Sequence, residues 1–392
     1  MIDAVILAAG KSVRMHPLTL AKPKPMLKIA NRPLLHWTLA NLQGIAKRVF
    51  IVVGYMKEKI SVDGFNLDIK FVEQKGQLGT AHALAAVEKM VGERFLVLPG
   101  DDLFGAEDIR RVVRYKLAVL AKETDRPWDF GIVEMERGKL KHIEEKPKEP
   151  KSRLANTGCY VLDRRIFPCI KRIKASPRGE LELTDAINEF AKSADIEIVN
   201  AREWIPITYP WDLLKANAVL LDRAKPRIDG KIERGVTVKG KLILGKGSTI
   251  RAGSYIEGPV MIGDDCIVGP NSFLRPYTCI GNGCKIGNAV EIKNSIIGNN
   301  SFVSHLSYVG DSVLGDSVNC GAGTITANLR HDGKNVKTRI NGKMVDTGLR
   351  KFGTVIGDDV KTGIHTAILP GRKIWPGRTT MPAEVVEEDK ID

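Results

Sequence analysis

The N-terminal stretch joins an apolar strand to a loop rich in cations. Residues 2–7 form an apolar run that predicts a buried strand, and Gly10 follows shortly after it. Arg14 lies in the polar loop beyond, and Lys24 stands between two prolines. Free backbone N–H groups at the end of a strand bind phosphate, and Arg and Lys neutralise its charge. The pattern therefore predicts a phosphate site, although a simple strand-to-helix turn can have a similar sequence.

Two carboxylates are placed where they could complete such a site. Asp101 follows a predicted strand at 94–98, and Asp212 opens a predicted helix at 211–225. Mg²⁺ is usually held by one or two carboxylates together with substrate phosphates. Two carboxylates opposite a cationic loop therefore predict a Mg²⁺–triphosphate site. The alternatives are that Asp212 only caps its helix and that Asp102 is only a turn residue.

A third chemical group, His305, lies within a six-residue repeat in the second half of the chain. Inward aliphatic residues recur at Ile262, Val268, Leu274, Ile280, Ile286 and Ile292. Neither the helix period of 3.6 nor the strand period of 2 produces this interval. A hexapeptide repeat is typical of a parallel β-helix, and glycines that follow four of these residues suit corners with an unusual backbone. We predict a left-handed parallel β-helix that begins loosely near Ile228 and is regular by Ile262.

The repeat is interrupted by two five-residue steps, Ile292 to Ile297 and Val309 to Leu314. His305 lies between the steps, on a turn that should point outward. Histidine is the usual general base near neutral pH. Considered alone, a surface histidine is the simpler interpretation. We expect the residues around the two steps to carry chemistry.

The first half has alternating elements, which favour a doubly wound α/β domain with a largely parallel sheet. In such sheets ligands bind at the carboxyl ends of the strands. Further strands are predicted at 48–53, 67–73, 129–134 and 156–162, and helices at 33–43, 79–90, 105–120 and 183–194. We expect a first domain at 1–222, a basic linker at 223–227 and the β-helix domain at 228–392.

Composition limits the classes of partner. The net charge is +14, from 60 basic and 46 acidic residues, without a block of five like charges. This favours anionic small molecules or plain solvation over nucleic acid. No apolar run approaches the ~20 residues that span a membrane, and the N-terminus lacks the basic region of a signal peptide. The six cysteines form no CxxC pair and predict buried thiols in a reducing cytoplasm.

Seven motifs resemble those of sugar-1-phosphate nucleotidylyltransferases, in the same order: LAAGKSVRM, PKPM, QKGQLGTAHA, PGDD, EEKP, NTGCY and YPWD. The resemblance implies a Rossmann-like domain in which a sugar 1-phosphate attacks a nucleoside triphosphate. Arg14 and Lys24 would contact the phosphates as catalytic cations, and Asp101 and Asp212 would hold Mg²⁺. The implied nucleotide- and sugar-binding residues are Gly10, Gln74, Gly79, Thr80, Gly131, Glu145 and Asn156. One departure is Ser12-Val13, where the family usually has a second glycine and a small hydroxyl residue.

The stretch 305–329, HLSYVGDSVLGDSVNCGAGTITANL, resembles the acetyltransferase half of bifunctional enzymes that make UDP-N-acetylglucosamine. The resemblance implies that His305 deprotonates the amine of glucosamine 1-phosphate. It also implies a homotrimer with sites between neighbouring chains. The implied ligand-binding residues are Arg275 and Lys293 for the sugar phosphate, Tyr308, Asn319 and Asn328 for the sugar, and Ala322 for acetyl-CoA.

The chain departs from the bacterial pattern after Asn328. Leu329 replaces a tyrosine, and residues 330–351 form an insertion. Asn341-Gly342 within it is typical of a type I′ hairpin turn. Archaeal relatives carry similar insertions, which indicates that branch of the family. The repeat is expected to resume at Ile356 and to stop soon after.

Three functions remain open from the sequence. The first is a bifunctional enzyme that acetylates glucosamine 1-phosphate, or galactosamine 1-phosphate, and couples the product to UTP or dTTP. The second is a nucleotidylyltransferase whose β-helix serves only for assembly. The third is a non-catalytic regulatory subunit. The candidate cations and carboxylates of the first half disfavour the third function. The second is disfavoured by the joint presence of Lys293, His305, Tyr308 and Asn319.

Overall fold

The computed structural model describes residues 1–391 and divides the chain into two compact units. The first unit contains Met1–Lys11 and Leu34–Pro206. The second contains Ser12–Pro33 together with the chain from Ile207 onward. The predicted division at residues 223–227 remains a prediction. Helix α6 (Pro210–Arg223) ends at Arg223, and the first β-helix strand begins at Arg227. No helix in the described range is long and apolar enough to cross a membrane.

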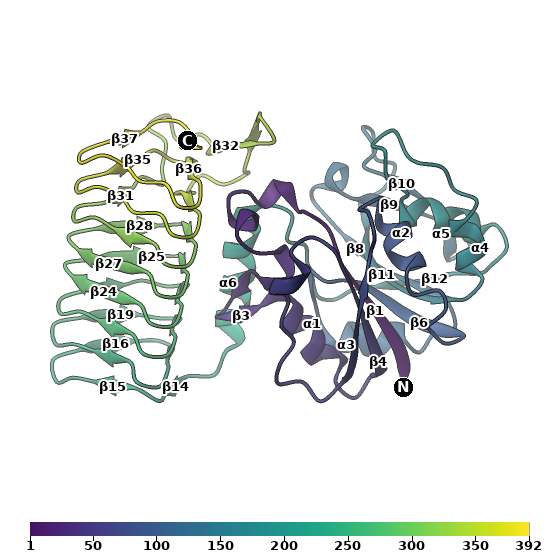
Figure 1. Ribbon diagram of the computed structural model, residues 1–392, viewed down its shortest axis with the longest axis horizontal. Helices are drawn as coiled ribbons and strands as arrows, with labels where there is room; N and C mark the ends of the chain where they lie inside the picture. The colour runs from purple at the N-terminus through teal and green to yellow at the C-terminus, as the bar shows by residue number, and fades with distance from the viewer. Residues whose placement is uncertain (392) are drawn as a thin grey trace. The chain divides into compact units, whose positions relative to one another are not determined.

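The first unit is built on a nine-stranded sheet (Figure 1). The strand order is β5 (Asp68–Glu73), β4 (Ala46–Val53), β1 (Ile2–Ala8), β6 (Arg94–Pro99), β11 (Leu154–Asp163), β8 (Ala118–Glu123), β12 (Glu197–Asn200), β10 (Lys139–Glu145), β9 (Gly131–Glu136). The helices are α1 (Leu34–Leu42), α2 (Thr80–Ala85), α3 (Ala106–Val112), α4 (Ile166–Ile170) and α5 (Leu183–Ala191), and β7 (Leu103–Phe104) pairs with β13 (Trp204–Ile205). The α/β class is confirmed.

The expectation of a largely parallel sheet is correct for one half of the sheet, but the other half is mixed, since β12 pairs parallel with β8 and the remaining pairs are antiparallel. The pairs among β5, β4, β1 and β6 are parallel. In contrast, β11 runs antiparallel to both β6 and β8, and β10 runs antiparallel to β12 and β9. The helix predicted at 105–120 was also wrong at its end, because α3 stops at Val112 and β8 begins at Ala118. A continuous apolar run does not distinguish a buried strand from a helix.

The second unit is a parallel β-helix with three stacked sheets (Figure 1). The first sheet contains β14 (Arg227–Ile228), β17 (Leu242–Leu244), β20 (Val260–Ile262), β23 (Thr278–Ile280), β26 (Ile296–Ile297), β29 (Val313–Leu314), β34 (Val355–Ile356) and β36 (Lys373–Ile374). The second contains β15 (Lys231–Ile232), β18 (Thr249–Ile250), β21 (Ile267–Val268), β24 (Lys285–Asn288), β27 (Phe302–His305) and β30 (Asn319–Cys320). The third contains β16 (Thr237–Lys239), β19 (Tyr255–Glu257), β22 (Phe273–Leu274), β25 (Glu291–Lys293), β28 (Tyr308–Gly310), β31 (Ile325–Thr326), β35 (Ala367–Ile368) and β37 (Val385–Val386).

The predicted ladder forms the core of this β-helix. Every inward residue from Ile262 to Leu314 is at most 2% exposed, and all belong to one apolar cluster. The ladder is longer than predicted at its C-terminal end, because it continues to Val386, and Leu244 belongs to its predicted irregular beginning. The C-terminal extension was missed because Thr362 and Thr380 occupy inward positions between aliphatic residues.

Three of the four glycines that follow ladder residues lack the unusual backbone predicted for them. Gly269 has φ 94°, but Gly263, Gly281 and Gly287 do not have a left-handed backbone. A Cβ at Gly281 would lie 2.7 Å from Asn299 Oδ1 and 2.9 Å from the Gly298 carbonyl carbon in the next coil. Glycine is therefore needed there because the coils approach closely, which is a common use of this residue.

The left-handed corner residues instead come three positions after most ladder residues, as at Asp265, Asn271 and Asn300. At the two five-residue steps the left-handed residue comes only two positions after, at Asn294 and Asp311. The stacking offset changes there as well: Ile262 pairs with Ile280, eighteen residues on, whereas Ile292 pairs with Val309, seventeen residues on. The steps are therefore shortened corners.

Two further segments belong to the second unit. The N-terminal segment Ser12–Pro33 contains three 3₁₀ turns and the short hairpin β2 (Lys28–Ile29) and β3 (Arg32–Pro33). The insertion contains the hairpin β32 (Lys337–Ile340) and β33 (Lys343–Asp346). Its turn residues Asn341 and Gly342 have φ values of 48° and 80°, and positive φ at both central positions confirms the predicted type I′ turn.

Candidate functional sites

Gln74 and Gly79, two of the predicted nucleotide- and sugar-binding residues, lie between β5 and α2. Gln74 comes directly after β5 and is buried. Its amide nitrogen donates to the Gly79 carbonyl at 3.0 Å and lies 3.0 Å from His82 Nδ1. Gly79 has φ 113°, and a Cβ there would collide with the Leu181 backbone, so glycine is required on both grounds. The Gln74 amide is thus held in one orientation.

Three more predicted residues of the first unit lie together. Gly131 pairs with Glu145 across β9 and β10, and a Cβ at Gly131 would lie 2.9 Å from Glu145 Oε2 and 3.7 Å from Asn156 Cβ. Burial raises the pKa of Glu145, although Arg178, at 3.3 Å, opposes the shift. A carboxyl group with a raised pKa suits a polar pocket that is partly shielded from water.

The remaining predicted residues of the first unit are Gly10, Thr80 and Asp101. Gly10 follows β1, and Thr80 begins α2, where its hydroxyl accepts the backbone N–H of Leu183 at 2.9 Å. Asp101 follows β6, at the carboxyl end of a central strand. The neighbouring Asp102 accepts the indole N–H of Trp204 at 3.0 Å, which agrees with its interpretation as a structural turn residue.

The second unit carries Arg14, Lys24 and Asp212. The Arg14 guanidinium lies 5.8 Å from the centre of the Tyr209 ring, and Lys24 is buried. Ser12 has φ 51° and ψ 46°, so this serine adopts the left-handed backbone that a second glycine would adopt easily. Asp212 is the third residue of α6, and its Oδ2 accepts the backbone N–H groups of Thr208 and Tyr209, both at 2.8 Å. It therefore has a structural role at the start of the helix.

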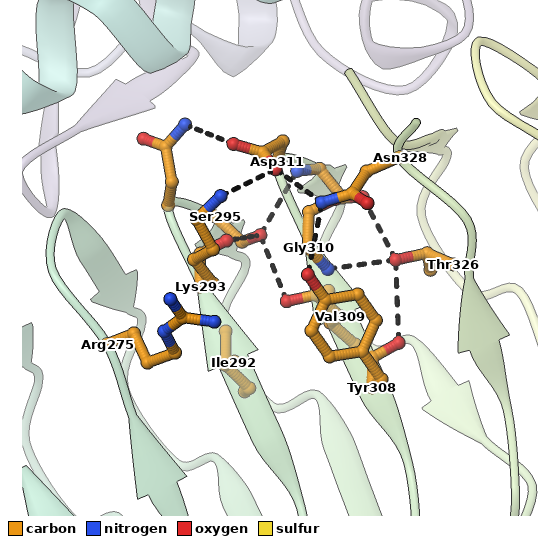
Figure 2. Close-up of polar contacts among 12 residues, drawn as sticks. Arg275, Ile292, Lys293, Ser295, Tyr308, Val309, Gly310, Asp311, Thr326 and Asn328 are labelled. Carbon is orange, nitrogen blue, oxygen red and sulfur yellow. Dashed lines mark hydrogen bonds and ion pairs between the residues drawn. The ribbon is translucent and has the colours of Figure 1, made fainter. Parts of the chain in front are cut away.

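The β-helix contains a polar cluster at the two shortened corners (Figure 2). Its centre is Asp311, which is 3% exposed. Asp311 Oδ2 lies 3.3 Å from Lys293 Nζ and accepts the Asn328 amide at 2.5 Å, and Oδ1 accepts the Asn294 amide at 2.7 Å. The same Asn328 amide donates to Tyr308 Oη at 3.0 Å. We call Lys293, Asn294, Tyr308, Asp311 and Asn328 the Asp311 cluster.

The Asp311 cluster depends on close packing. A Cβ at Gly310 would collide with Tyr308 Oη, so only glycine lets this hydroxyl lie over the strand. Burial raises the pKa of Tyr308, and the hydrogen bond from Asn328 opposes the shift. Arg275 lies at the border of the cluster (Figure 2). It forms an ion pair with Glu291 at 2.8 Å. Lys293 and Arg275 are cations, and Tyr308 and Asn328 are neutral polar groups; groups of these kinds can bind a sugar phosphate.

Asp311 and Asn294 were missed from the sequence, although a signal existed. Asn294, Asp311 and Asn328 are spaced by seventeen residues, the stacking offset that follows the first shortened corner. Such spacing places equivalent residues of successive coils above one another. A polar residue repeated at this interval, at a shortened corner, therefore indicates that polar side chains of successive coils meet there.

The other predicted acetyl-transfer residues form a second group, which contains His305, Asn319 and Ala322. His305 ends β27 and is exposed, and its carbonyl accepts the N–H of Gly323, next to Ala322. Asn319 lies on the neighbouring strand β30. Within residues 1–391, no hydrogen bond or ion pair joins this group to the Asp311 cluster.

Two protein families match the chain. Residues 3–223 match the nucleotidyl transferase family, and residues 256–381 match the GMPPB C-terminal domain. The putative glucose-1-phosphate thymidylyltransferase of Bacillus anthracis, a solved structure, superposes with a TM-score of 0.51 at 31% identity, over 56% of this chain and 95% of that one.

Curated relatives match over almost the whole length. The bifunctional protein GlmU of Methanocaldococcus jannaschii is 41% identical over 99% of this chain and 96% of its own. The bifunctional sugar-1-phosphate nucleotidylyltransferase/acetyltransferase of Sulfurisphaera tokodaii is 39% identical over 99% and 98%. Both halves of the chain, and the order in which they occur, are therefore common to these proteins.

Proposed function

Because this chain belongs to the family of bifunctional, GlmU-type sugar-1-phosphate nucleotidylyltransferase/acetyltransferases, we propose that it acetylates glucosamine 1-phosphate and then couples the product to UTP. The reaction products would be a UDP-N-acetylhexosamine, pyrophosphate and free coenzyme A. Galactosamine 1-phosphate and dTTP are the alternative substrates. A homotrimer and a cytoplasmic location are parts of the same proposal, and the six buried free cysteines fit a reducing compartment.

The observation that carries acetyl transfer is the Asp311 cluster. A β-helix that served only for assembly would have no need for a buried carboxylate that holds Lys293, Asn294 and Asn328. Buried charges are costly unless they are paired, so such clusters are concentrated at functional sites. The cluster supports Lys293 and Arg275 as the residues that bind the sugar phosphate, and Tyr308 and Asn328 as residues that contact the sugar.

In the proposed acetyl transfer, His305 accepts a proton from the ammonium group of the sugar. The neutral amine then attacks the thioester carbonyl and forms the carbon–nitrogen bond. The carbon–sulfur bond breaks, and the second proton that the attacking nitrogen loses passes to the sulfur, so the coenzyme leaves as a thiol. A neutral amine is required because a protonated one has no electron pair to donate. A site that two chains of a trimer complete together is part of the same proposal.

In the proposed nucleotidyl transfer, a phosphate oxygen of the sugar 1-phosphate attacks the α-phosphorus of UTP in line with the departing pyrophosphate. The substrate supplies its own nucleophile, so the protein positions the reactants and neutralises charge. Arg14 and Lys24 supply the positive charge, and the rigid Gln74 amide reads the base. Asp101 and Asp212 are carboxylates, the ligand type that Mg²⁺ prefers, and the bound metal would neutralise the charge that develops on the phosphates.

A substrate panel on each half-reaction tests this function. Release of free thiol from acetyl-CoA would be measured with glucosamine 1-phosphate and galactosamine 1-phosphate. Release of pyrophosphate would be measured with UTP and dTTP on the two acetylated sugars. We expect one amino sugar to be preferred in the thiol measurement and one nucleotide to be preferred in the pyrophosphate measurement. A protein that releases neither thiol nor pyrophosphate with any pair would favour a regulatory subunit instead.

Asp311→Ala should impair acetyl transfer selectively. The change leaves Lys293 and two amides without their buried acceptor, which should lower the free energy of unfolding by about 1–3 kcal/mol. It should also lower kcat/KM for acetyl transfer by about tenfold or more, mainly through KM for the sugar phosphate, while nucleotidyl transfer is retained. Thiol release and chemical denaturation measure the two effects.

Asp359→Ala is the matched control for this variant. Asp359 is also a left-handed aspartate at a β-helix corner, with φ 60°, but it is exposed. Alanine at position 359 would adopt the same left-handed backbone as alanine at position 311, but Asp359→Ala removes no buried contact. Equal losses of acetyl transfer in Asp311→Ala and Asp359→Ala would show that the cluster has no special role.

A further inference from the structure

The N-terminal segment Ser12–Pro33 is anchored to the β-helix, although its sequence belongs to the nucleotidylyltransferase resemblance. This segment carries Arg14 and Lys24, the two cations proposed to contact the nucleotide phosphates. A cationic loop of this kind works only if its side chains are held in place before the substrate arrives. The residues that anchor the segment therefore bear on catalysis.

The strongest anchor is Lys22, two residues before Lys24. Its ammonium lies 2.5 Å from Asp316 Oδ2 and 3.0 Å from Asp358 Oδ2. The Lys22 side chain is 20% exposed and that of Asp358 is 12% exposed. Both carboxylates belong to corners of the β-helix, on neighbouring coils that the insertion separates by 42 residues in the sequence.

The two aspartates end a column of stacked polar side chains along one edge of the β-helix. In this column each side-chain oxygen accepts a backbone N–H from the preceding coil, at 2.7–3.1 Å. The donor and acceptor pairs are Lys246 and Asp264, Asp264 and Asn282, Asn282 and Asn299, Asn299 and Asp316, and Asp316 and Asp358. Asp316 and Asp358 each use Oδ1 in the column and direct Oδ2 to Lys22.

Two adjacent carboxylates repel each other unless a cation lies between them. Burial raises the pKa of Asp358, although Lys22 opposes this effect. Burial also acts to lower the pKa of Lys22, but the charges of Asp358 and Asp316 outweigh it and the pKa is raised. The three groups thus depend on one another, and both carboxylates need a lysine that comes from the N-terminal segment.

Two further anchors hold the ends of the segment. Near Arg14, the buried Lys373 donates to the carbonyl of His16 at 3.1 Å and to that of Arg339 in the insertion hairpin at 2.7 Å. At the other end, the Asn31 amide donates to the carbonyl of Ile280 at 2.7 Å. The contacts follow the first sheet of the β-helix, from β23 to β36, so the segment is fixed along several coils.

Helix α6, which carries Asp212, is fixed to the same unit. Trp211 packs edge-on against the fully buried Phe352 at 5.8 Å, and it stacks on Tyr209 at 4.4 Å. The buried Asn217 accepts the N–H of Ala30 and donates to the carbonyl of Tyr277, both at 3.0 Å. The three nucleotidyl-transfer residues of the second unit therefore all lie on elements held by the β-helix.

We propose that Lys22 is a positioning residue for nucleotidyl transfer and that the β-helix, through Asp316 and Asp358, orients Arg14 and Lys24 for that reaction. The inference rests on the proposed nucleotidyl-transfer function. It gives the β-helix a role in both reactions, which neither assembly nor acetyl transfer explains.

Lys22→Met tests the inference in the full-length protein. It removes the charge and keeps an unbranched side chain that is one atom shorter. We expect kcat/KM for pyrophosphate release to fall by about 10–100-fold, since small displacements of positioning groups have effects of this size. Thiol release from acetyl-CoA should stay within about twofold of the unaltered protein. Lys22→Arg should recover most of the lost activity, and Lys246→Met, at an exposed lysine of the same edge, should have no effect.

A double variant separates positioning from stability. Lys22→Met leaves the Asp316–Asp358 pair without its cation, and adding Asp358→Asn removes the repulsion while the amide oxygen can still accept the N–H of Asp316. The double variant should regain the melting temperature but keep the low nucleotidyl-transfer activity. The inference is overturned if nucleotidyl transfer recovers together with the melting temperature, or if a folded Lys22→Met is fully active. Absence of pyrophosphate release by the unaltered protein would instead overturn the proposed function itself.

Discussion

Asp101→Ala should abolish nucleotidyl transfer and leave acetyl transfer intact. Asp101 lies at the carboxyl end of the central strand β6, where α/β sheets place their ligands. As a proposed Mg²⁺ ligand it contributes to charge neutralisation worth several kcal/mol, and about 1.4 kcal/mol is a factor of ten in rate. We therefore expect pyrophosphate release to fall by at least about a hundredfold. The measurement is pyrophosphate release from UTP and N-acetylglucosamine 1-phosphate over a range of Mg²⁺ concentrations.

Asp102→Asn provides the control for this prediction. Asp102 is the adjacent carboxylate, and its contact with Trp204 is structural. An amide oxygen can still accept that indole N–H, so activity should stay close to that of the unaltered protein. If Asp102→Asn were the inactive variant and Asp101→Ala the active one, the assignment of the metal ligand would be wrong.

His305→Ala should have the opposite effect. General base catalysis typically contributes about 10²–10⁴-fold, and acetyl transfer should fall by that factor. The exposed position of His305 at the end of β27 means that its removal leaves no cavity, so the melting temperature should not change. Thiol release from acetyl-CoA measures the loss, and pyrophosphate release from pre-acetylated substrate should be normal.

His331→Ala is the matched control, because His331 is an exposed histidine of the insertion. It should retain both activities. A loss of both activities together in a folded His305→Ala protein would contradict two independent sites.

The sequence was sufficient for the repetitive part of the fold. The six-residue interval identifies the inward residues from Ile262 to Leu314 because each coil of a β-helix buries the same positions. The extension beyond Ile356 escaped the same reasoning, since Thr362 and Thr380 hide the aliphatic pattern. The type I′ hairpin of the insertion was predictable because its turn depends only on the local Asn341-Gly342 pair.

The sites were predictable in residue type more than in arrangement. Resemblance identified Lys293, Tyr308 and Asn328 as candidates, but not the buried Asp311 that joins them. Nor could the sequence indicate that Lys22 would pair with Asp316 and Asp358, since such a contact spans about three hundred residues and leaves no local pattern. The repeat predicts only which residues of neighbouring coils stack on each other. It does not predict an ion pair with a residue outside the β-helix, such as Lys22.

The central claim is that one chain performs both reactions in order, with acetyl transfer first. The most direct test supplies the unaltered protein with glucosamine 1-phosphate, UTP, Mg²⁺ and acetyl-CoA, and follows thiol and pyrophosphate together. The account predicts that pyrophosphate release depends on acetyl-CoA and follows thiol release with equal final amounts. Pyrophosphate release from N-acetylglucosamine 1-phosphate, without any thiol release on glucosamine 1-phosphate or galactosamine 1-phosphate, would contradict the account. It would leave a nucleotidylyltransferase whose β-helix has no acetyl-transfer activity.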